Sequence, residues 1–192
     1  MRELMAVLLA VAAGNAPGNH GIGRPATAEE VRARDITVLP SGAGLPPGKG
    51  TARDGRRAYE TRCGVCHGAR GEGQGDYPPI AGGRGTLATD QALPTVGAYW
   101  PYATTVWDYI RRGMPYDHPG TLSADQTYAV TAYVLYLNGI VTEDEVLDEH
   151  TLARVEMPNR HGFVADPRPP EKPAGHQPMG EAQRFRRKRV SE

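Results

Sequence analysis

The sequence predicts a small all-α domain with extended segments at both ends. Stretches with helix-starting and helix-ending residues occur at 51–62, 104–112 and 123–138. The 24 glycines and 17 prolines concentrate outside these stretches, at the two ends of the chain and in a middle loop over 68–97. A chain of 192 residues has the length of one domain. Its formal net charge of zero gives no field that would favour nucleic acid as a partner.

Residues 1–16 have the pattern of a secretory signal. Arg2 precedes a short apolar run, and small residues suited to cleavage lie near Ala13 and Ala16. The run is too short to span a bilayer, so we expect no membrane span in the mature protein. We therefore expect the chain to be exported.

Residues 17–50 are polar and then rich in glycine and proline, and we predict an extended segment because these residues forbid a regular helix. Two interpretations stay open, a free linker and a strap that lies on the domain. Apolar residues that could hold a strap are Ile36, Val38, Leu39 and Leu45.

The C-terminal region is predicted to have two parts. Residues 142–165 could pack back on the domain, and repeated proline, glycine and charge predict a disordered tail over 166–192. The basic run at 184–189 is interpreted as part of a solvated tail, with a docking arm for an acidic partner as the alternative.

Both cysteines lie in one short motif, Cys63-Gly64-Val65-Cys66-His67. Cys-x-x-Cys-His is typical of c-type haem attachment, in which the two thiols bind the haem vinyl groups. The adjacent His67 would then be the proximal ligand of the iron. We predict one covalently attached haem c within residues 51–141, around which the small domain wraps. Export agrees with this prediction, because c-type cytochromes mature outside the bacterial inner membrane.

Three other interpretations of the cysteines are weaker. A structural zinc site needs four nitrogen or sulfur ligands, and this motif supplies at most three. A thioredoxin-like pair belongs to a βαβ pattern, whereas a glycine-rich loop follows here. A disulfide between Cys63 and Cys66 would close a very short loop and stabilise little.

The first and last predicted helices are expected to contact each other. The first runs from Thr51 or Ala52 to Arg62, and Gly55 and Tyr59 share one of its faces. Gly55 would allow another helix to approach closely. In the last helix, Ser123 and Gln126 can form a capping box, and Gly139 would end it.

The loop over 68–97 contains Pro78-Pro79-Ile80-Ala81-Gly82, which matches a Pro-x-apolar-x-Gly pattern of cytochromes c. There, the proline carbonyl accepts a hydrogen bond from the proximal imidazole and sets its basicity. Pro78 is expected to take that role, and Ile80 to pack on the porphyrin face. The glycines are not a phosphate-binding loop, because no Gly-Lys-Ser/Thr follows.

Met114 is the predicted sixth ligand of the iron. It lies in Gly113-Met114-Pro115, between a helix and a loop, and a methionine with a histidine is usual in electron-carrying cytochromes c. The alternatives are Met157, ligation by His118, and ordinary core packing of the methionine.

Rings of the Tyr99–Tyr102 cluster can be buried and still donate a hydrogen bond. Candidate partners of the haem propionates are therefore Trp100, Tyr102 and Arg84, although ordinary packing is an equal alternative.

The chain resembles the SoxD-type cytochromes, the cytochrome c subunits of sulfite or sulfane dehydrogenases in sulfur-oxidising bacteria. The resemblance covers about residues 36–164, and its most specific part is Trp-Pro-Tyr-Ala-Thr-Thr at 100–105. Other matching stretches are 82–87, 108–115, 129–140 and 157–160. It implies a class I cytochrome c-like fold, a monohaem form and a periplasmic location. It also implies a SoxC-like molybdenum-cofactor subunit as electron donor.

The predicted function is electron transfer to another c-type cytochrome, so the chain is not expected to be an enzyme by itself. One alternative is a free-standing periplasmic carrier or a cytochrome subunit of a different dehydrogenase. Another is a haem enzyme, such as a peroxidase or a gas-binding protein, which would need a displaceable sixth ligand.

Overall fold

The computed structural model describes residues 23–168, and the chain divides into two units between Thr37 and Val38. The predicted signal at 1–16 and the predicted tail beyond 168 lie outside the described residues. Among residues 23–168 there is no helix long and apolar enough to cross a membrane.

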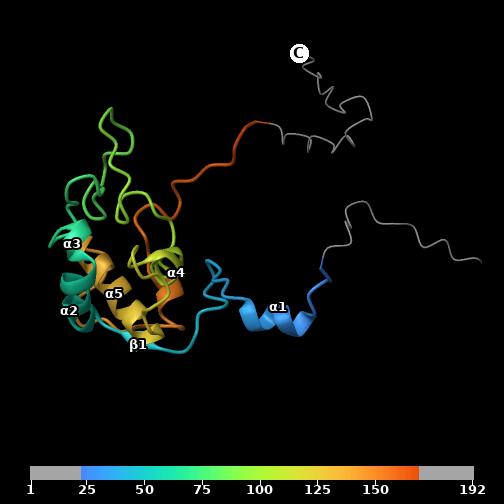
Figure 1. Ribbon diagram of the computed structural model, residues 1–192. Helices are drawn as coiled ribbons and strands as arrows, with labels where there is room; N and C mark the ends of the chain where they lie inside the picture. The colour runs from blue at the N-terminus through green and yellow to red at the C-terminus, as the bar shows by residue number, and fades with distance from the viewer. Residues whose placement is uncertain (1–22, 169–192) are drawn as a thin grey trace, which may run out of the picture. The chain divides into compact units, whose positions relative to one another are not determined.

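The first unit contains α1 (Ala28–Arg34), shown in blue in Figure 1. The expectation of an extended segment throughout 17–50 is therefore wrong at these residues. Thr27 forms a capping box with Glu30, whose amide donates to the Thr27 hydroxyl at 3.2 Å. The Arg24 guanidinium, together with the Thr27 amide, lowers the pKa of Glu30 to about 2. The helix forms because Thr27 caps it and residues 28–34 contain neither proline nor glycine.

The second unit is organised around α5 (Ala124–Leu137), which lies between α2 (Ala52–Arg62) and α4 (Ala103–Gly113) in Figure 1. All three predicted helices are confirmed to within a residue or two at their ends. The predicted capping box of Ser123 with Gln126 is also present.

The contact between α2 and α5 is as close as the sequence predicts. A side-chain carbon added at Gly55 would lie 1.9 Å from the Ala129 carbonyl oxygen, so only glycine allows this approach. One helical turn later, the rings of Tyr59 and Tyr133 pack with centroids 5.0 Å apart.

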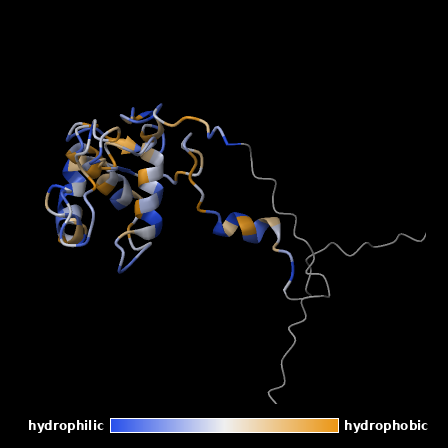
Figure 2. Ribbon diagram, turned by 90° about the horizontal axis from the view of Figure 1, so that it is seen from above, coloured by the Kyte–Doolittle hydropathy of each residue, from blue (hydrophilic) through white to orange (hydrophobic). Residues whose placement is uncertain are grey.

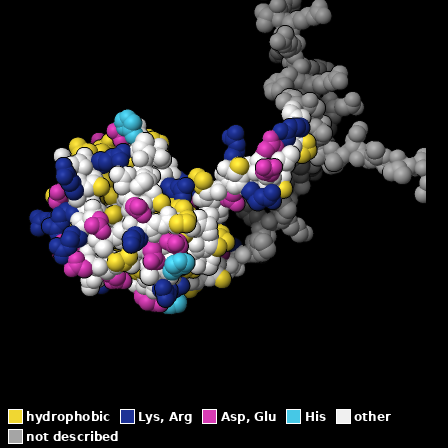
Figure 3. Space-filling view, turned by 90° about the horizontal axis from the view of Figure 1, so that it is seen from below, with side chains coloured by type: hydrophobic (Ala, Val, Ile, Leu, Met, Phe, Trp, Pro, Cys, Tyr) yellow, Lys and Arg dark blue, Asp and Glu magenta, His cyan; other side chains and the backbone are white. Residues whose placement is uncertain are grey.

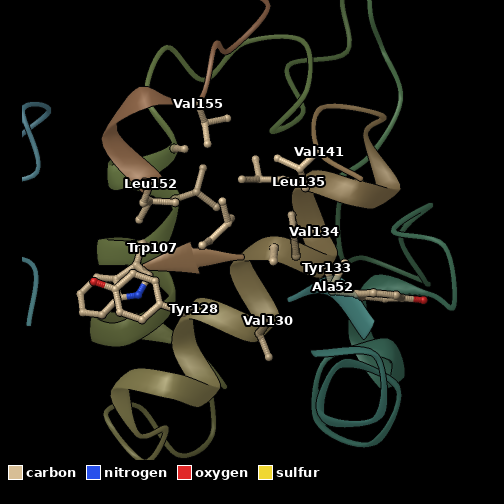
Figure 4. Close-up of a cluster of buried hydrophobic side chains, with 14 of the residues drawn as sticks. Ala52, Trp107, Tyr128, Val130, Tyr133, Val134, Leu135, Val141, Leu152 and Val155 are labelled. Carbon is tan, nitrogen blue, oxygen red and sulfur yellow. The ribbon is translucent and has the colours of Figure 1, made fainter. Parts of the chain in front are cut away.

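The core fills the space between α4, α5 and the C-terminal segment (Figure 4). Trp107 and Tyr128 are fully buried with ring centroids 5.2 Å apart, and Tyr128 donates a hydrogen bond to the Pro46 carbonyl. Leu135 and Leu152 are also fully buried. Hydrophobic residues accordingly gather at the centre of this unit in Figure 2, while its loops are mostly hydrophilic.

Residues 38–50 lie on the second unit, which favours the strap over the free linker for this part of the chain. Val38 and Leu45 pack against the core, whereas Leu39 is exposed. The strap ends in β1 (Lys49–Gly50), which pairs antiparallel with β2 (Leu147–Asp148).

Residues 142–164 fold back on the helices. Leu147 of β2 and Leu152 of the 3-10 helix η1 (Leu152–Arg154) are fully buried. Ion pairs attach the start of this segment to α2, from Arg53 to Asp144 and from Arg56 to Glu143. Acidic and basic side chains are interspersed on the face seen in Figure 3, in keeping with the zero net charge.

Candidate haem-binding site

The Cys-x-x-Cys-His motif lies on α3 (Gly64–His67), one short turn of helix that follows α2 directly (Figure 1). Cys63 ends α2 and begins α3: its amide donates to the Tyr59 carbonyl at 2.8 Å, and its own carbonyl accepts from the amide of His67 at 2.9 Å. Gly68 ends the turn in the left-handed region, with φ 76°. The backbone therefore sets Cys66 and His67 at fixed positions relative to Cys63.

The two cysteines are free and half-buried. Burial raises the pKa of Cys63 to about 11, and the neighbouring Cys66 adds to this shift while Arg62 opposes it. Thiols of redox-active pairs have lowered pKa values, so this environment does not favour a thioredoxin-like function. Within residues 23–168, no three His, Cys, Asp or Glu side chains come together as a metal site, which also disfavours structural zinc.

His67 has a buried Nδ1 atom that makes no hydrogen bond with residues 23–168. Burial lowers the pKa of this imidazole, and the nearby Pro78 carbonyl opposes the shift. The backbone around Pro78 lies against Gly73, whose amide donates to the His67 carbonyl at 2.8 Å, so Pro78 is close to His67. The lowered pKa favours the neutral imidazole, which is the form that ligates a metal. These residues fit a covalently attached haem.

Four of the predicted site residues pack against the same core. They come from four separate segments and are all partly buried: Cys63, Ile80, Trp100 and Met114. The fold therefore gathers attachment, porphyrin-packing and axial-ligand candidates around one core.

The three candidates for the sixth ligand have different environments. Met114 follows α4, and its amide donates to the Ile110 carbonyl at 3.0 Å, while its side chain remains half-exposed. Met157 is only 3% exposed and belongs to the core. The His118 side chain is 71% exposed and lies 3.0 Å from Asp117. A ligand must be able to reach a cofactor at the surface of the core, so the structure favours Met114.

The three candidate propionate partners, Arg84, Trp100 and Tyr102, each contact a different residue of the unit. Arg84 is exposed and donates to the Asn138 carbonyl at 3.1 Å. The guanidinium carbon of Arg160 lies 5.3 Å from the centroid of the Tyr102 ring. Trp100 packs edge-on against Tyr109. Their role toward a haem stays a prediction.

Two residues that the sequence did not single out join the segments of the site. Thr95 is buried and donates from its hydroxyl to the Gly82 carbonyl at 2.5 Å. The Asn138 side chain bonds both Ile80 and Gly82. An asparagine before a glycine at a helix end was the available signal for Asn138, whereas nothing in the sequence around Thr95 indicated its role.

Comparisons with known proteins identify the family of this chain. Residues 52–138 match the family described as Cytochrome c. The crystal structure of the sulfane dehydrogenase SoxCD from Paracoccus pantotrophus is similar with a TM-score of 0.71 and 45% sequence identity, over 78% of this chain and 73% of that chain. A thiosulfate dehydrogenase of Psychrobacter arcticus is 31% identical over 90 residues, which make up 44% of this chain. The match spans only 25% of that curated relative's length.

The all-α fold and the haem-attachment motif define a class I cytochrome c, an electron-transfer protein with covalently bound haem c. The chain belongs to the cytochrome c family, and its predicted membership of the SoxD-type cytochromes is confirmed. In it, Cys63 and Cys66 would hold the haem and His67 would ligate the iron, supplying a one-electron redox couple.

Proposed function

We propose that this chain is the monohaem subunit that receives electrons from a SoxC-like molybdenum-cofactor subunit. That subunit would oxidise a sulfur compound, either sulfite or a sulfane sulfur, and this chain would pass the electrons singly to another c-type cytochrome. The observation that carries the proposal is the 45% identity to a chain of the sulfane dehydrogenase SoxCD over 73% of that chain.

A single haem and a periplasmic location belong to the same proposal. The 192 residues contain only two cysteines, both in one attachment motif, which supports one haem. The signal pattern at 1–16 supports export to the compartment in which haem c is attached.

The side chains of the site support electron transfer over substrate chemistry. Burial lowers the pKa of His67 and so favours the neutral form that can bind iron, and Met114 is the half-exposed candidate for the opposite ligand. With both ligands in place, no iron position would stay open for a substrate. Cys63, Ile80, Trp100 and Met114 are partly buried against the core, and such burial is one way in which a protein tunes a cofactor.

The test is to purify a tagged form of the chain together with a co-expressed SoxC-like subunit and to add substrate. We expect the two subunits to co-purify and sulfite or a sulfane donor to reduce the haem rapidly, as followed by its visible absorption. The control is the isolated chain with the same substrate, which should stay oxidised. Failure of the subunits to associate, with no substrate-driven reduction in the mixture, would contradict the proposal.

The similarity to a thiosulfate dehydrogenase favours a second candidate, in which the chain reacts with thiosulfate directly. Reduction of the isolated chain by thiosulfate, with rapid carbon monoxide binding to its ferrous form, would support this haem-enzyme function. A chain that resists both reagents and accepts electrons from an unrelated dehydrogenase would instead be a free-standing carrier.

A further inference from the structure

Asn138 holds a fixed position at the C-terminal end of α5. The amide of Ile140 donates to the Leu135 carbonyl at 3.0 Å, and the amide of Gly139 donates to the Tyr136 carbonyl at 2.8 Å. Gly139 has φ 64°, so the helix ends in a Schellman motif. The backbone of Asn138 is therefore set by the helix rather than by the loop that it contacts.

The side chain of Asn138 uses both ends of its amide. Its Nδ2 donates to the carbonyls of Val134 at 2.8 Å and Ile80 at 3.2 Å, and its Oδ1 accepts from the amide of Gly82 at 3.2 Å. Two acceptors on one side and a donor on the other dictate the orientation of the amide group. A side-chain carbon at Gly97 would lie 2.3 Å from Oδ1, so a glycine leaves room for this contact.

The segment that Asn138 bonds is the one that contains the candidate acceptor for His67. Ile80 and Ala81 donate from their amides to the Gly71 carbonyl, and the amide of Val96 donates to the Ile80 carbonyl at 3.2 Å. Those partners lie in loops, whereas Asn138 joins the same segment to the end of a buried helix. Pro78, two residues before Ile80, lies against Gly73, whose own amide donates to the His67 carbonyl at 2.8 Å.

We propose that Asn138 is a positioning residue for the haem. By holding the Ile80 carbonyl and the Gly82 amide, it sets the Pro78 oxygen against Nδ1 of His67. An acceptor on Nδ1 raises the basicity of a histidine ligand, so the end of α5 would tune the reduction potential. The inference rests on the bound haem of the proposed function and not on the identity of the electron donor.

The test compares Asn138→Leu with the unaltered haem protein, because leucine has a similar size and cannot form the three hydrogen bonds. The first readout is the exchange rate of the His67 Nδ1 proton, measured by NMR. We expect it to rise at least about tenfold, since a loosened acceptor protects the proton less. The second readout is the reduction potential, which should rise because a weaker hydrogen bond makes His67 a poorer electron donor.

Asn159→Leu is the matched control. Asn159 also donates from its amide to a backbone carbonyl, that of Tyr99 at 2.8 Å, but this carbonyl belongs to another loop. The control should leave proton exchange and potential unchanged even where it lowers stability. Asn138→Ser keeps one hydroxyl donor, so its proton exchange rate and reduction potential should lie between those of the unaltered protein and of Asn138→Leu. It serves as the test variant if Asn138→Leu does not fold.

The outcomes separate this inference from the proposed function. An Asn138 variant that carries haem but matches the Asn159 control in both readouts would overturn the positioning role. An unaltered chain that is matured normally and carries no covalent haem would instead refute the haem assignment and the proposed function with it.

Discussion

Replacing Gly55 by alanine should force α2 away from α5. The added carbon would lie 1.9 Å from the Ala129 carbonyl oxygen and 2.9 Å from the Val130 amide nitrogen, whereas ordinary contact begins at 3.4 Å. The obstructing atoms are backbone, so no side chain can rotate aside and the helices must separate by about 1.5 Å. The packing of Tyr59 against Tyr133, one turn along the same interface, would be disturbed as well.

The expected loss of stability follows from two opposing effects. Overpacking costs typically about 1–3 kcal/mol, and contact with backbone places this site at the upper end. Alanine recovers about 1 kcal/mol because it is a better helix former than glycine. We therefore expect the free energy of unfolding to fall by about 2 kcal/mol, measured by urea unfolding of the haem protein. With a typical urea dependence, the midpoint would fall by about 1 M.

Gly113→Ala is the matched control, because Gly113 also lies in a helix but has no atom within 4 Å of an added carbon. It should leave the midpoint unchanged or raise it. A Gly55→Ala protein as stable as the Gly113→Ala protein would refute the close approach of α2 and α5.

Three further predictions concern the ligand, a buried tyrosine and the C-terminal segment. Met114→Ala should abolish the weak charge-transfer band at the red end of the ferric spectrum. Met157→Ala should keep the band but lower the free energy of unfolding by about 2–5 kcal/mol, because it truncates a core side chain. Tyr59→Phe removes a buried hydrogen bond to the Gly68 carbonyl, so it should cost about 1–3 kcal/mol near neutral pH in urea unfolding. Burial raises the pKa of Tyr59, so its neutral form stabilises the fold below the unfolded pKa of about 10. This contribution is lost as the pH rises further, and Tyr59→Phe should show a shallower alkaline decline; an equally steep one would refute the argument. Leu147→Ala should lower the free energy of unfolding by about 2–5 kcal/mol, and a negligible change would mean that residues 142–164 are not part of the folded unit.

Local signals predicted most of the helical structure. Thr51 and Ser123 lie before helices and Gly139 after one, and each sequence pattern carried the capping group that the structure uses. The same kind of signal was present at Thr27 and Glu30, but the surrounding prolines and glycines led to the wrong prediction of an extended segment. The helix there is short, and short helices depend on a few capping contacts that composition does not reveal.

The candidate site was predicted where its chemistry is contiguous in sequence. Cys63, Cys66 and His67 form one motif, so one turn of helix suffices to arrange them. The burial of Met157, which is only 3% exposed, could be seen only in the structure. Burial is a property of the whole fold, and a lone methionine in a sequence carries no sign of it.

By itself, the sequence indicated a haem-attachment motif and three helices, because both follow from bonding and capping between near neighbours. Only the tertiary structure decided what holds residues 78–82, which follow the attachment motif, in place. The contacts of Asn138 with Ile80 and Gly82 join residues more than fifty positions apart. Such pairings depend on how α5 packs against the rest of the domain, and no local pattern encodes them.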